Sequence, residues 1–200
     1  MSTATDQLPM LDLRSDTVTH PTDAMRAAMA NAVVGDDQFG EDPTVRELEE
    51  TAARMLGMEA AVFVASGTMG NLVALLAHCG RGDEVIMGDE CHIFWYESGG
   101  AAALGGMPFA LLPNDRFGQL PLDRVRNMIR ANRPGYPRTG VICVESTQES
   151  SKGTILPLDY LAELRGIARD AGVPVHMDGA RIFNAAAGSD TPVEQIASHV

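Results

Sequence analysis

Short apolar runs alternate with amphipathic stretches along most of the chain. Five runs of strand length, rich in aliphatic and β-branched residues, lie at 60–65, 84–87, 108–112, 141–144 and 173–177. The stretches between them show the apolar spacing that is typical of helices, most clearly at 121–130 and 158–171. Because no hairpin signals join the strands, this alternation predicts an α/β fold with a mostly parallel sheet flanked by helices.

The N-terminal part of the chain carries further predicted elements. Residues 1–10 are expected to be disordered, and helices are expected at 22–31 and 43–56, the second of them capped by Asp42. The chain shows no internal repeats and no low-complexity segments. Residues 11–200 are therefore predicted to form one domain.

Composition narrows the possible classes of function. The chain has 27 acidic and 15 basic residues, and its formal net charge of −12 argues against a nucleic-acid partner. It has no apolar run of 18 residues, so no membrane span is predicted, and its N-terminus lacks the basic end and apolar core of a secretory signal. The three cysteines are scattered and odd in number, which suits a reduced, cytoplasmic protein. They show no metal-binding spacing, so no bound metal is expected. They are Cys79, Cys91 and Cys143.

Three polar segments each follow a predicted strand. The turn at 66–71 reads SGTMGN and opens a helix, the segment 89–100 contains His92, and Asp178 directly follows the run at 173–177. Ligands of parallel sheets bind beyond the carboxyl ends of the strands. These segments are therefore predicted to converge on one crevice.

Two of these segments have residues suited to a phosphate and a pyridine ring. The start of a helix binds anions, Gly67 lets a phosphate approach the backbone, and Thr68 can add a hydroxyl, although helix packing explains the same turn equally well. The carboxylate of Asp178 needs a cationic partner at the end of a buried strand. Arg181 is one candidate, and the protonated ring nitrogen of pyridoxal phosphate (PLP) is another. A lone histidine such as His92 is more often structural than catalytic.

Five motifs stand in the same order as in the low-specificity L-threonine aldolases. They are LRSDTVT, GDDQFGEDPTV, SGTMGN, HIFWYESGG and VHMDGARIFNAA. The chain resembles this family of PLP-dependent β-eliminating lyases over nearly all of residues 11–200. The resemblance implies an aspartate-aminotransferase-like fold (PLP fold type I), with these residues as the PLP-binding large domain. It also implies retro-aldol cleavage of β-hydroxy-α-amino acids such as L-threonine to glycine and an aldehyde.

The resemblance assigns the cofactor contacts to individual residues. It implies that Gly67 and Thr68 hold the phosphate, that His92 stacks on the ring, and that Asp178 pairs with the pyridine nitrogen. A protonated nitrogen makes the ring an electron sink for the carbanion at Cα, which Asp178 favours. His92 and Asp178 are thus the implied catalytic residues.

The substrate contacts follow from the same resemblance. Arg181 and Ser15 are expected to contact the carboxylate of the amino-acid substrate or nearby cofactor oxygens. The family's sites lie at a subunit interface, and this implies a homodimer or homotetramer.

The first departure from the family concerns lysine. Members of the family carry a lysine after the DGAR motif that forms a Schiff base with the cofactor. The only lysine of this chain is Lys152, which precedes Asp178 and lies in a polar loop that indicates a solvated side chain. The chain ends at Val200, before the family's lysine segment and C-terminal small domain. We therefore expect a truncated large domain that is inactive alone.

The second departure follows the strand that ends at Glu145. The family usually has an Asn-Thr-His-Asn loop there, whereas this chain reads STQE at 146–149. Gln148 cannot act as a base near neutral pH, so His92, Glu145 or a water would have to deprotonate the β-hydroxyl. Two alternatives stay open, namely a β-eliminating PLP lyase with another amino-acid substrate and a non-catalytic PLP-fold remnant that acts as an interaction module.

Overall fold

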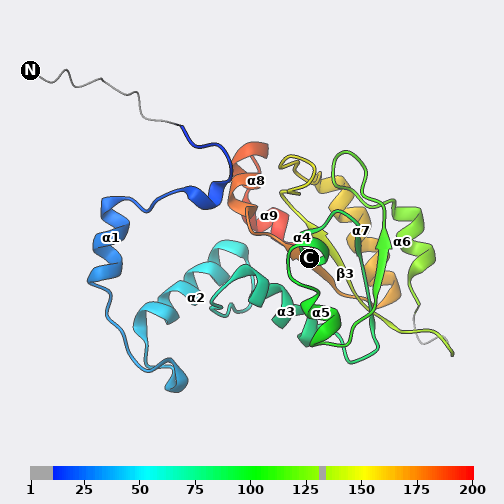
Figure 1. The fold of residues 1–200 in the computed structure, drawn as a ribbon, viewed down its shortest axis with the longest axis horizontal. Coiled ribbons are helices and arrows are strands. Elements are labelled where there is room, and N and C mark those ends of the chain that lie inside the picture. The colour runs from blue at the N-terminus through cyan, green and yellow to red at the C-terminus, as the bar shows by residue number, and fades with distance from the viewer. Residues whose placement is uncertain (1–10, 131–133) are drawn as a thin grey trace, which may run out of the picture. The chain divides into compact units, whose positions relative to one another are not determined.

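The computed structural model describes residues 11–130 and 134–200. The predicted disorder of residues 1–10 lies outside this part of the chain. The described residues form two compact units, and the boundary between Glu47 and Leu48 falls within helix α2 (Pro43–Leu56). Apart from α2, each helix and strand belongs to one unit (Figure 1).

The unit before the boundary consists of short helices. They are the 3-10 turns η1 (Asp16–Val18) and η2 (Asp37–Phe39), the helix α1 (Asp23–Ala30) and the start of α2. α2 begins as predicted, because Asp42 Oδ1 accepts hydrogen bonds from the N–H groups of Thr44 and Val45 at 2.9 and 3.0 Å. These bonds satisfy two N–H groups that a helix start otherwise leaves without partners.

Four parallel strands form the sheet of the second unit. They are β1 (Glu84–Gly88), β2 (Phe109–Leu112), β3 (Thr139–Glu145) and β4 (Val175–Asp178). Their order is β2-β1-β3-β4, and every neighbouring pair is parallel. The predicted parallel sheet and four of its five predicted strands are therefore confirmed.

Each face of the sheet has its own apolar core, because successive residues of a strand point to opposite faces. One core joins Ile86 and Ile142 to side chains from four helices, and the other joins Val85 and Val141 to side chains from three. The helices of the first core are α6 (Leu122–Met128), α7 (Leu158–Ala171), α8 (Ile182–Ser189) and α9 (Val193–Ala197). Those of the second are α3 (Gly67–His78), α4 (His92–Trp95) and α5 (Gly100–Ala103).

The apolar run at 60–65 is not a strand, so this prediction is wrong. The run pairs with none of the four strands, and Val62 and Phe63 are 70% and 53% exposed. The backbone N–H of Phe63 donates to Glu49 Oε1 at 2.7 Å instead of to a neighbouring strand. An apolar run indicates a tendency to be buried, but it does not specify which strand would pair with it.

The carboxyl ends of the strands position the candidate site. His92 follows β1, Glu145 is the last residue of β3, and Asp178 is the last residue of β4. The chain places β2 on one side of β1 and then β3 on the other side, so the order in which strands are added reverses between β1 and β3. Such a switch point leaves a crevice for a ligand between the loops that follow the two strands. No helix within the described ranges is long and apolar enough to span a membrane.

The two-sided core gives a test of the fold. Leu164 of α7 is 1% exposed, so Leu164→Ala should lower the free energy of unfolding by about 2–5 kcal/mol through lost burial and a cavity. Leu104→Ala is the matched control, because Leu104 is 65% exposed and its loss should cost less than about 0.5 kcal/mol. Urea denaturation followed by circular dichroism measures both, and equal losses would contradict the assignment of Leu164 to the core.

Candidate functional site

The N-terminus of α3 has the features that an anion site requires. Ser66 is the N-cap residue, and its Oγ accepts a hydrogen bond from the N–H of Met69 at 3.1 Å. Gly67 and Thr68 form the exposed first turn, where backbone N–H groups lack intrahelical partners. A Cβ on Gly67 would meet no atom within 4 Å, so the space beside this turn is open for a group such as a phosphate.

Asp178 is held by hydrogen bonds to both of its carboxylate oxygens. Oδ1 accepts from the N–H of Ala180 at 3.1 Å, and Oδ2 accepts from Asn71 Nδ2 at 2.9 Å. The Asn71 amide also donates to Glu97 Oε1 at 2.7 Å, and its own oxygen lies 2.8 Å from His176 Nε2. Asn71 lies in the second turn of α3, so the start of this helix is tied to the end of β4.

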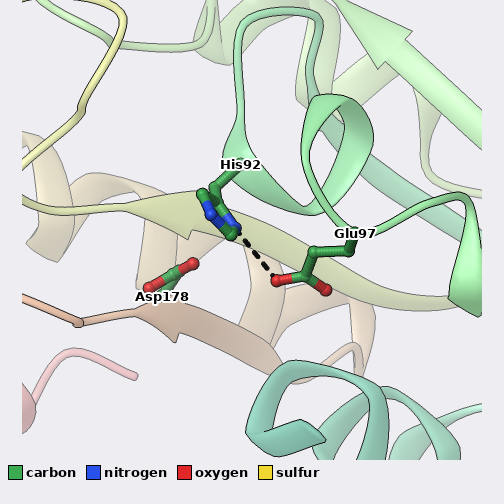
Figure 2. Close-up of side chains that lie close together, drawn as sticks. All are labelled: His92, Glu97 and Asp178. Atoms are coloured by element: carbon green, nitrogen blue, oxygen red, sulfur yellow. Dashed lines mark hydrogen bonds and ion pairs between the residues drawn. The ribbon is translucent and has the colours of Figure 1, made fainter. Parts of the chain in front are cut away.

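His92 points toward both Glu97 and Asp178 (Figure 2). Its Nδ1 lies 3.0 Å from Glu97 Oε1, and because a carboxylate only accepts, Nδ1 is the donor. One nitrogen or oxygen atom from each of the three side chains lies within 4.8 Å of the others. The side chain of His92 is 32% exposed and that of Glu97 only 5%, so the imidazole is the accessible member of the pair.

Glu145 joins this cluster from the neighbouring strand. The register of β3 and β4 places it opposite Asp178. Its Oε2 accepts from the backbone N–H of His92, and its Oε1 accepts from that of Glu149, both at 2.8 Å. Burial raises the pKa of Glu145, and the two hydrogen bonds oppose this rise. Glu145 therefore fixes the backbone at the residue where α4 begins.

The gathered carboxylates fit the cationic ring nitrogen of PLP. Glu97, Glu145 and Asp178 repel one another at this edge of the sheet, and a protonated ring nitrogen would offset that repulsion. The carboxylate of Asp178 keeps lone pairs for such a donor beyond its two hydrogen bonds. A metal ion fits less well, because Asn71 and His92 already donate to the oxygens that would be its ligands.

The predicted substrate contacts lie in different units. Arg181 is the N-cap residue of α8, three residues after Asp178, and it is half-buried. Ser15 belongs to the first unit, where its Oγ accepts from the N–H and the hydroxyl of Thr17 at 3.2 and 2.9 Å. The roles of Arg181 and Ser15 toward a substrate stay predictions.

Gln148, which stands where the family usually has a histidine, supports the loop after β3. It is 1% exposed. Its Nε2 donates to the carbonyl oxygen of Glu90 at 2.8 Å, and its Oε1 accepts from the N–H of Ser151. The bond to Glu90 links the loop after β3 to the loop after β1, and the bond to Ser151 lies within the loop after β3.

Lys152 lies in an exposed loop position with a φ of 64°. It lines a pocket of about 410 Å³ with residues such as Asn114 and Arg116, and neither His92 nor Asp178 lines that pocket. A groove of about 840 Å³ along α6 and α7 likewise includes none of the predicted site residues. Lys152 is therefore an exposed loop residue away from His92 and Asp178, as its polar sequence context predicts.

Comparison with known proteins settles the family. The sequence profile of the family described as Beta-eliminating lyase matches residues 12–200. The chain belongs to the β-eliminating lyase family. The predicted resemblance is thereby confirmed.

Several curated relatives of this β-eliminating lyase chain are named threonine aldolases. It is 49% identical over 189 residues to low-specificity L-threonine aldolase 1 of Arabidopsis thaliana, covering 93% of this chain and 53% of that protein. It is 44% identical over 190 residues to the low specificity L-threonine aldolase of Escherichia coli K12, covering 95% and 56%. The chain therefore spans about half the length of the curated relatives it matches.

Solved structures confirm the fold class. The threonine aldolase of Leishmania major matches with a TM-score of 0.74 at 22% identity, over 89% of this chain and 52% of that one. At this identity the match shows the fold alone. It agrees with the predicted PLP fold type I, in which helices flank a parallel sheet.

Three residues of the hydrogen-bond network around His92 and Asp178 were not predicted from the sequence. Asn71 and Glu97 lie inside the motifs SGTMGN and HIFWYESGG, but the motifs assigned them no role. His176 precedes Asp178 by two residues, and this spacing puts both on one face of β4. The spacing was the one available signal for His176.

His176 gives this β-eliminating lyase chain a pH-dependent stability. Burial lowers the pKa of His176, so the unfolded chain takes up a proton at a higher pH than the folded chain does. The free energy of unfolding should therefore fall as the pH decreases from the ordinary value of 6.5 toward the folded-state pKa.

The substitution His176→Gln isolates this effect. Glutamine keeps a donor toward Asn71 but cannot be charged, so the loss of stability between about pH 7.5 and about pH 5.5 should be smaller than in the wild type. Urea denaturation at each pH measures the loss, and His20→Gln at an exposed position is the control. An unchanged pH dependence in His176→Gln would contradict the role of His176.

Proposed function

We propose that this chain is the cofactor-binding part of a PLP-dependent lyase that cleaves β-hydroxy-α-amino acids, such as L-threonine, to glycine and an aldehyde. The proposal rests on Asp178, whose carboxylate ends β4 beside His92 and is tied by Asn71 to the start of α3. Relatives named low-specificity L-threonine aldolase support the same substrate class. Because the chain spans about half their length, the complete activity is part of the proposal.

The cofactor contacts are assigned as follows. When bound, PLP supplies an electron sink for the charge that develops at Cα as the Cα–Cβ bond breaks. The N–H groups of Gly67 and Thr68 would bind its phosphate at the start of α3. Asp178 would keep a proton on the ring nitrogen, since a nearby carboxylate favours the charged ring. His92 would contact the ring.

The substrate is oriented through its carboxylate. Arg181 would bind this group and would hold the substrate in one orientation for cleavage of the Cα–Cβ bond. A contact of Ser15 with the substrate stays a prediction. Arg181 is close to Asp178 in sequence, at the start of α8, which supports its role toward the carboxylate.

His92 is the best candidate for taking the proton from the β-hydroxyl. Its Nδ1 donates to Glu97, which leaves Nε2 as the nitrogen that can accept a proton. Each oxygen of Glu145 already accepts a backbone N–H, and the amide of Gln148 is no base and is engaged elsewhere. A substrate other than L-threonine stays the second candidate, because Gln148 replaces the histidine that the family usually carries.

The cellular setting is also a proposal. All three cysteines are free and buried, which suits a reducing compartment such as the cytoplasm. The amino-acid substrate is the expected small-molecule partner. The assignment of residues 11–200 to a single PLP-binding large domain stays a prediction.

Asp178→Asn tests the proposed function. The amide keeps the size of the side chain but loses its charge, so the ring nitrogen should lose its proton and turnover of L-threonine should fall at least about 100-fold. PLP affinity should change less, because the phosphate turn is untouched.

Glycine and aldehyde formation are measured with the 200-residue chain and with any longer natural chain that contains it. Asp170→Asn is the matched control, because the Asp170 side chain is 68% exposed. L-serine is assayed in parallel to test the second candidate, a substrate other than L-threonine. Full turnover by Asp178→Asn would contradict the assignment of Asp178.

We further expect a homodimer or larger species. Met69, Val73 and Leu76 form an apolar stripe along α3 and are 41–48% exposed, and apolar stripes of this kind are commonly covered by a partner. Light scattering at micromolar concentration in moderate salt should report a dimer or larger. Val73→Glu should weaken association, whereas Leu104→Glu adds the same charge elsewhere and should not. A monomeric wild type would overturn this expectation.

A further inference from the structure

The side-chain amide of Asn71 contacts three polar side chains at once. Asn71 is 6% exposed. Its Nδ2 donates to Asp178 Oδ2 at 2.9 Å and to Glu97 Oε1 at 2.7 Å, and its Oδ1 lies 2.8 Å from His176 Nε2. Turning the amide by half a rotation would set its carbonyl oxygen against two carboxylates. The amide orientation is therefore fixed, and His176 is the donor to Oδ1.

The two carboxylates have different second partners. Glu97 Oε1 also accepts from His92 Nδ1, so Glu97 orients the imidazole. Asp178 is the carboxylate that the proposed function assigns to the ring nitrogen of the cofactor. The amide thus stands between the group that would hold the ring nitrogen and the group that would orient the residue on the ring face.

We propose that Asn71 is a positioning residue that fixes Asp178 and His92 relative to each other, acting on His92 through Glu97. The inference rests on the proposed function, because both residues are assigned there to the pyridine ring. Asn71 itself need not touch the cofactor or the substrate.

Charge explains why a shared donor is needed. Two neighbouring carboxylates repel, and each N–H of the amide stabilises the charged form of the one it contacts. Without the amide, Glu97 and Asp178 would separate, and Glu97 would leave the place from which it accepts the Nδ1 proton of His92. His176 supports the arrangement from the other side, because burial lowers its pKa and keeps it a neutral donor.

Nuclear magnetic resonance of the wild-type chain gives the first test. Both Nδ2 protons of Asn71 should be shifted by their carboxylate acceptors and protected from exchange with water. Neutral His92 should carry its proton on Nδ1. Free exchange of the Asn71 protons, or a neutral His92 protonated on Nε2, would overturn the proposal without any substitution.

Asn71→Leu and Asn71→Ala give the second test. The leucine excludes water from the vacated space, and the alanine covers the case in which the leucine variant fails to fold. In either variant we expect the Nδ1-protonated form of His92 to fall by about half or more, and PLP affinity to fall about tenfold. Asn127→Ala, which removes an exposed asparagine from α6, should change neither.

These outcomes separate the inference from the proposed function. A folded Asn71→Leu or Asn71→Ala chain that keeps the wild-type state of His92 would overturn the role of Asn71 even if PLP binds. A wild-type chain that binds no PLP would contradict the proposed function, while the state of His92 would still decide whether Asn71 fixes the Glu97–His92 pair.

Discussion

A carboxylate at the end of a buried parallel strand must find partners, and this need determines how the candidate site is built. β4 ends at Asp178, and its register with β3 sets Glu145 directly opposite. Two charges about 4 Å apart repel by about 4 kcal/mol at an effective dielectric constant of 20, whereas one neutral hydrogen bond contributes only about 1 kcal/mol. Donors must therefore come from several elements, and they do: a side chain of α3 and the backbone at the starts of α4 and α8.

Much of the fold could be predicted because burial leaves a periodic trace in the sequence. The predicted helix at 158–171 has the bounds of α7, since leucines recur on one face and Gly172 ends it in a left-handed conformation. Four strands were found because runs buried on both faces stand out between polar turns. The proximity of His92 and Asp178 could be predicted because the carboxyl ends of parallel strands lie at the same edge of a sheet.

The parts that could not be predicted depend on contacts between distant residues. Asn71 and Asp178 are 107 positions apart, and their bond requires both the strand order and the rotation of α3 about its axis. Periodicity reports neither of these. The strand predicted at 60–65 is wrong for a related reason. The apolar character of the segment is a local property, whereas a strand in a sheet needs a neighbouring strand to pair with. The motifs located the site, but they did not reveal the hydrogen bonds that link its residues.

The buried thiol of Cys91 has a consequence for the chemistry that this site tolerates. Cys91 directly precedes His92 as the N-cap residue of α4, and burial raises its pKa to about 12. The thiolate, and not the thiol, is the reactive nucleophile. At neutral pH the sulfur beside the site is therefore almost wholly protonated. A carbonyl electrophile that entered the proposed site would therefore meet little thiolate from Cys91, and little covalent adduct should form.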